Sequence, residues 1–68
     1  MPEAAHLSLA RLRLNLAAAR QQLAAAREHH RELRAPTLRH HSLQRLLELH
    51  AYVRQLEREL MKAESANG

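Results

Sequence analysis

Residues that break helices are almost absent from this chain. The 68 residues include two prolines, Pro2 and Pro36, and one glycine, Gly68, so a single break interrupts the interior. Proline lacks a backbone donor and biases the residue before it away from helical angles. The sequence therefore predicts one domain, 1–68, with helices at about 3–34 and 38–64 and a turn at about 35–37. Thr37 or Ser42 is the expected cap of the second helix.

A repeated phrase, Leu-Ala-Ala-Ala-Arg, occurs at residues 16–20 and 23–27. Its seven-residue spacing is that of a coiled-coil core, in which two positions of each heptad face a partner helix. In the first helix these positions hold Leu9, Leu16, Leu23 and His30, alternating with Leu12, Ala19, Ala26 and Leu33. In the second helix they hold Leu46, Val53 and Leu60, alternating with Leu49, Leu56 and Ala63.

Folding the chain back at Pro36 predicts which core residues face each other, because facing residue numbers should then add up to about 72. The expected pairs are Ala26 with Leu46, Leu23 with Leu49, Ala19 with Val53, Leu16 with Leu56, and Leu12 with Leu60. Each alanine faces a larger side chain, and such matching fills a core without voids. The predicted fold class is all-α, an antiparallel two-helix hairpin.

The apolar surface of the second helix is broader than one neighbouring helix can cover. Leu43, Leu47 and Met61 lie outside the predicted seam, and the chain has no cysteine to form a disulfide. A core of this size rarely supplies more than about 3–5 kcal/mol. We therefore expect a homodimer that forms a four-helix bundle, or else a different protein that buries the same surface. The expected core and dimer residues are Leu16, Leu23, Leu43, Leu46, Leu47, Val53 and Leu56.

Four arginines share one heptad position beside the core: Arg13, Arg20, Arg27 and Arg34. In the hairpin this edge meets Leu43, His50, Glu57 and Glu64. We expect carboxylates near Arg13, whereas Arg20 and Arg27 should face residues that do not neutralise them. The edge is either solvated and salt-bridged or a contact for an acidic partner.

Tyr52 is the only aromatic residue and lies near Arg45 and Glu59 on one edge of the second helix. Tyrosine and arginine are enriched at binding hot spots. The tyrosine ring either contacts a partner protein or packs on the dimer interface. The expected partner-binding residues are therefore Arg13, Arg20, Arg27, Arg34 and Tyr52.

Four histidines, His29, His30, His40 and His41, lie on the two sides of the turn. Imidazoles bind zinc, nickel or copper. Adjacent histidines on a helix point about 100° apart, so at most one of each pair faces the seam. Two ligands do not close a site, and we expect no metal and no cofactor.

Catalytic constellations are poorly represented in the sequence. It has no cysteine, no aspartate and no glycine loop for phosphate, and a small bundle offers little concave surface. We expect a protein that is not an enzyme. The net charge of +4 and the pI near 11.1 suit an acidic partner.

The sequence thus predicts a small protein-interaction module of the adaptor, co-chaperone or inhibitor type. RNA binding through the arginine edge is the alternative. The helix length, turn and heptad resemble the small Rop-type hairpin dimers, which implies RNA binding. They also resemble the helical-hairpin co-chaperones of type III secretion, which implies cover for a partner's apolar surface. Without a membrane-length apolar run or a signal-like segment, a cytoplasmic location is expected.

Overall fold

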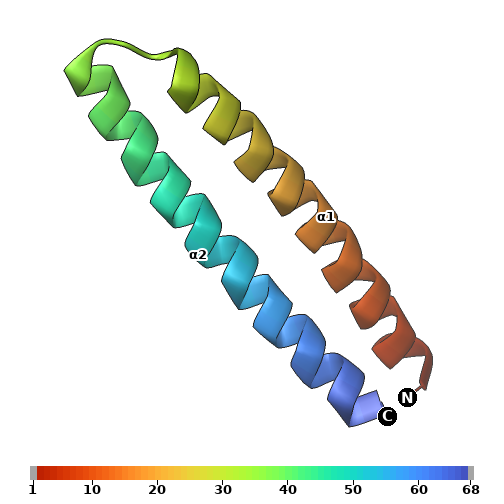
Figure 1. Cartoon of the computed structure of the whole chain (residues 1–68). Coiled ribbons are helices and arrows are strands. Elements are labelled where there is room, and N and C mark those ends of the chain that lie inside the picture. The colour runs from red at the N-terminus through yellow and green to blue at the C-terminus, as the bar shows by residue number, and fades with distance from the viewer. Residues whose placement is uncertain (1, 68) are drawn as a thin grey trace.

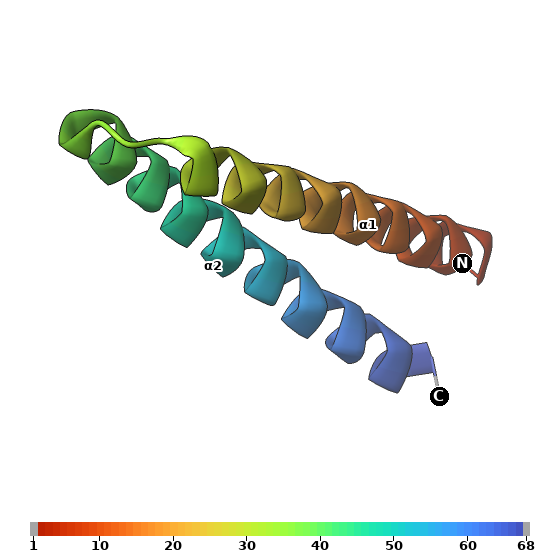
Figure 2. The same cartoon turned by 45° about the horizontal axis from the view of Figure 1, so that its top comes forward.

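Two antiparallel helices make up the computed structural model, which describes the backbone of residues 2–67 and the side chains of residues 9–66. Helix α1 spans Pro2–Glu32 and helix α2 spans Pro36–Asn67 (Figure 1). The hairpin is a rod of 52 × 14 × 13 Å. The helices are inclined to each other (Figure 2). The predicted all-α hairpin is confirmed.

The turn consists of residues 33–35, two residues earlier than the sequence predicted. Pro36 is the first residue of α2, a position where its missing N–H has no intrahelical partner to lose. The carbonyl of Ala35 accepts the first helical hydrogen bond, from the amide of Arg39 at 2.9 Å. Thr37 and Ser42 both lie inside α2, so the prediction that either caps this helix is wrong.

Arg39, in the first turn of α2, closes the carboxyl end of α1. Its guanidinium donates to the carbonyl oxygens of Leu33, at 2.8 Å, and His30, at 3.4 Å. The amide of Leu33 also donates to the carbonyl of His30, at 3.2 Å. A cation bonded to the last carbonyls suits the negative end of the helix dipole. This contact replaces the glycine that commonly ends a helix.

The core is one row of side chains along the seam between the helices. Its buried cluster is Leu16, Ala19, Leu23, Leu49, Val53 and Leu56, with Leu12, Ala26, Leu46 and Leu60 packed against it and partly buried. These ten residues are the five pairs that the heptads predicted to face each other. Leu43 and Leu47, expected in the core or the dimer interface, lie outside the hairpin core with exposed fractions of 47% and 62%.

Neither helix offers, over the described residues, an apolar stretch long enough to cross a membrane.

Candidate interaction surfaces

The arginine edge of α1 is partly neutralised by α2. Arg20 pairs with Glu57 at 2.9 Å, and Arg13 lies 3.6 Å from Glu64. The expectation that no carboxylate faces Arg20 is wrong. In each pair the residue numbers add up to 77, five more than in the core pairs, because both partners lie beside the core on the same edge. All four side chains are about half exposed, so each pair stabilises the hairpin by at most about 1 kcal/mol.

The charges of the other two arginines of the edge are not neutralised by a facing carboxylate. The same spacing places Arg27 opposite His50 and Arg34 opposite Leu43, neither of which offers a carboxylate. Among the described side chains, none forms an ion pair with Arg27 or Arg34. The edge is therefore neutralised towards the open end of the hairpin and positively charged near the turn.

Large apolar side chains of α2 lie beside this edge, exposed to solvent. Leu43, Leu47 and Met61 are 47%, 62% and 69% exposed. A shallow groove of about 410 Å³ lies between Met61 and Arg20, and Glu57 also lines it. We call the side of the hairpin that carries the four arginines and these three side chains the leucine–arginine face; it comprises Arg13, Arg20, Arg27, Arg34, Leu43, Leu47 and Met61.

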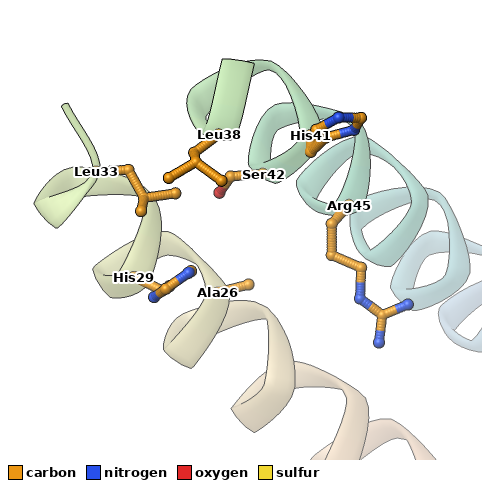
Figure 3. Close-up of a pocket in the computed structure, with 7 residues that line it drawn as sticks. All are labelled: Ala26, His29, Leu33, Leu38, His41, Ser42 and Arg45. Atoms are coloured by element: carbon orange, nitrogen blue, oxygen red, sulfur yellow. The ribbon is translucent and has the colours of Figure 1, made fainter. Parts of the chain in front are cut away.

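A second hollow, of about 300 Å³, lies next to the turn on the opposite edge of the hairpin. We call it the turn pocket. Its apolar wall consists of Leu33, Leu38 and Ala26, and its polar groups are His29 of α1 and His41, Ser42 and Arg45 of α2. Figure 3 shows Leu33 and Leu38 facing each other beside the turn, the His29 ring directed towards α2, and the Arg45 side chain extending along α2 away from the turn.

The sequence placed the two histidine pairs on either side of the turn, but it did not predict this pocket. The sequence feature that indicates this edge is the heptad position on the other side of the core. It holds His29 in α1 and Leu38, Arg45 and Tyr52 in α2. Tyr52 is 45% exposed, one heptad beyond Arg45 on the same edge. The structure therefore separates the predicted partner-binding residues, with the arginines on one edge and Tyr52 on the other.

The histidines near the turn differ in their surroundings. His40 and His41 are neighbours on α2, with ring centroids 6.0 Å apart, and both are exposed. His30 is partly buried, and its Nε2 lies 3.4 Å from the Arg39 guanidinium. Its Nδ1 is buried without a hydrogen-bond partner. In the part of the chain that the structure describes, no group of three or more histidine, cysteine or acidic side chains is placed to hold a metal ion.

Comparison with known proteins gives no match to a family model, to a curated protein or to a solved structure.

Proposed function

We propose that this chain is a non-catalytic protein-interaction module, a helical hairpin that associates reversibly with a second copy and binds a partner protein. The observation that carries the proposal is the leucine–arginine face. It exposes Leu43, Leu47 and Met61 beside arginines that the hairpin only partly neutralises. Large apolar side chains exposed beside polar and charged groups are typical of a protein-binding site.

The shape of this face suits a second copy in the antiparallel sense, with the two turns at opposite ends. On α1 the exposed alanines Ala10, Ala17 and Ala24 recur every seven residues. With the two Ala17 residues at the twofold axis, Ala10 of each copy lies level with Ala24 of the other. In the same arrangement, Leu47 of one copy and Met61 of the second copy lie at about the same height along the long axis of the dimer. The small side chains let the α1 helices approach closely while the larger ones fill the wider gap between the α2 helices.

Charge complementarity favours the same arrangement. Helical rise places Arg27 of one copy level with Glu64 of the second, and Arg20 level with Glu57 of the second. Arg27, which has no carboxylate across the hairpin, thereby gains one. If the two turns lay at the same end, Arg27 would instead lie among the basic residues of the second turn. Because the middle of this interface is polar and paired, its burial gives little net energy, and we expect micromolar, reversible association.

Sedimentation velocity tests the self-association. We expect a dimer at tens of micromolar for the unmodified chain and a monomer for Leu47→Glu and for Met61→Glu. Tyr52→Glu is the matched control, since Tyr52 is 45% exposed but lies on the opposite edge of the hairpin. A monomeric unmodified chain, or a dimer that persists in both variants, would contradict the proposed interface.

The binding of a partner is tested by affinity capture from the native cell with Arg34→Glu as the comparison. Arg34 carries no ion pair in the described structure and makes none of the charge pairs of the proposed dimer, so the variant should keep its helicity, melting temperature and dimer while losing the captured protein. Gel shifts with duplex DNA and structured RNA test the alternative. Binding that weakens steeply with salt and is lost in the same variant would make this a nucleic-acid-binding protein instead.

A further inference from the structure

The turn pocket lies on the edge opposite the leucine–arginine face, so the proposed dimer leaves it open. It combines an apolar wall, Leu33 and Leu38, with the guanidinium of Arg45 and a hydroxyl from Ser42. Both helices contribute, and the pocket is present only because the turn brings residues 33 and 38 together (Figure 3). Among residues 9–66, no acidic side chain lines it.

The positive charge of the pocket is not neutralised by neighbouring acidic side chains. Arg45 makes no ion pair among the described side chains, and Glu28, the nearby acid of α1, is paired with Arg31 at 3.2 Å. Glu32 and Glu48 lie within one helical turn of His29 and Arg45 in sequence, but neither lines the pocket. The groups that face the hollow are therefore apolar, cationic or hydrogen-bond donors.

We propose that the turn pocket binds an acidic segment of the partner protein, one in which a leucine-like side chain stands next to an aspartate or glutamate. The apolar side chain packs between Leu33 and Leu38, and the carboxylate of the neighbouring residue accepts hydrogen bonds from the Arg45 guanidinium, which extends away from the turn (Figure 3). Charge-assisted bonds from arginine to carboxylate are among the stronger polar contacts in proteins. This inference rests on the proposed function and names the partner's recognised element.

The size of the pocket and its surroundings favour a segment of protein over an enclosed small molecule. A volume of about 300 Å³ bounded by only two helices is at the lower limit of small-molecule sites, which bury most of their ligand. It accommodates one or two side chains of a longer chain. Tyr52 lies one heptad beyond Arg45, about 10.5 Å along the same edge, where the segment would continue.

Nuclear magnetic resonance titration of the ¹⁵N-labelled full chain tests the site directly. The probes are the peptide acetyl-Leu-Glu-Leu-Glu-amide and its neutral analogue acetyl-Leu-Gln-Leu-Gln-amide. We expect the acidic peptide to shift the amide signals of Leu33, Leu38 and Ser42, and the neutral peptide to bind at least fivefold more weakly. N-acetyl-leucine, a small free acid, is the third probe and should bind more weakly than the acidic peptide.

Matched variants separate the pocket from general positive charge. Arg45→Gln should weaken binding of the acidic peptide at least fivefold. The control Arg58→Gln removes the same group from an exposed position that does not line the pocket, and should change binding less than twofold. Sedimentation of Arg45→Gln should still show the dimer, so a failure of this inference is distinguishable from a failure of the proposed function.

Four results would overturn the inference. The first is the absence of shifts around the pocket at millimolar acidic peptide, and the second is equal binding of the acidic and neutral peptides. The third is tighter binding of N-acetyl-leucine than of the acidic peptide, which would assign the pocket to small carboxylic acids. Equal loss of affinity in Arg45→Gln and Arg58→Gln would likewise show that only the net charge of the chain attracts the peptide.

Discussion

Ala19 sets the distance between the two helices. It is the most buried of the core side chains, with an exposed fraction of 2%, and its predicted opposite residue is Val53. Because the core is a single row, every residue in it contacts the facing helix directly, and a small side chain permits close approach of the backbones. A change in the size of the side chain at position 19 therefore alters the packing of both helices.

Ala19→Leu should destabilise the hairpin by about 1–3 kcal/mol, because three added carbon atoms overfill a packed seam. Urea denaturation followed by circular dichroism measures the loss. Ala25→Leu is the control, since Ala25 is exposed on the same helix and should tolerate leucine with little change. Equal stability of the two variants would show that position 19 does not limit the helix spacing.

His30 is a polar residue in a heptad core position, and its Nδ1 is buried without a partner. Burying a polar group unsatisfied costs about 1–3 kcal/mol, and His30→Leu also gives up the long contact to Arg39. We expect the substitution to raise the free energy of unfolding by about 1 kcal/mol in urea denaturation. His29→Leu, at an exposed neighbouring position, should give no such gain. A destabilised His30→Leu would mean that the contact with Arg39 outweighs the unpaired nitrogen.

At the scale of the helices, the connection depends on Arg39. This residue belongs to α2 but satisfies carbonyl oxygens at the end of α1, so the two helices share one cap. The arrangement lets a three-residue turn form without glycine, and no residue of the described backbone has a positive φ angle.

Arg39→Ala should lower the free energy of unfolding by about 1 kcal/mol, the worth of exposed hydrogen bonds from a cation to backbone carbonyls. Thermal melting of Arg39→Ala beside Arg58→Ala provides the comparison, because Arg58 is exposed on α2 and makes no hydrogen bond or ion pair among the described residues. If both variants melt together, the cap contributes nothing measurable.

The helices and their register were predictable from the sequence because heptad spacing and one proline determine both. The numbers of Leu16 and Leu56 add up to 72, as do those of every predicted core pair, and the cluster contains all ten residues. The turn was misplaced because Pro36 was read as ending a helix, whereas its fixed φ angle suits the first residue of one. The Arg20–Glu57 pair was accessible to the same arithmetic, with a sum of 77.

The turn pocket could not be predicted in this way. Heptad positions place His29 and Leu38 on one edge, but a hollow depends on how large side chains stack where the helices separate into the turn. That geometry is set by Leu33, a predicted seam position that lies in the turn, and by Leu38, in the first turn of α2. Periodicity describes the repeating part of a molecule and carries no information on the place where the repeat stops.

For the whole molecule, self-association should make thermal stability depend on concentration. A second copy that binds only the folded hairpin stabilises it by mass action. The melting temperature of the unmodified chain and of Tyr52→Glu should rise over a hundredfold increase in concentration, from a few micromolar upward, whereas that of Leu47→Glu should stay constant. A constant melting temperature for all three proteins would contradict a dimer in this range.

The single-file core also makes the length of this molecule adjustable in units of one heptad. Deleting residues 17–23 together with 49–55 would remove two facing segments of seven residues and shorten the rod by about 10.5 Å. The remaining core residues would keep their phase around each helix and their facing partners, and the turn with its pocket would stay intact. Such a chain has a minimum length, set by how many facing pairs are needed to outweigh the entropy of ordering two helices, but no intrinsic maximum.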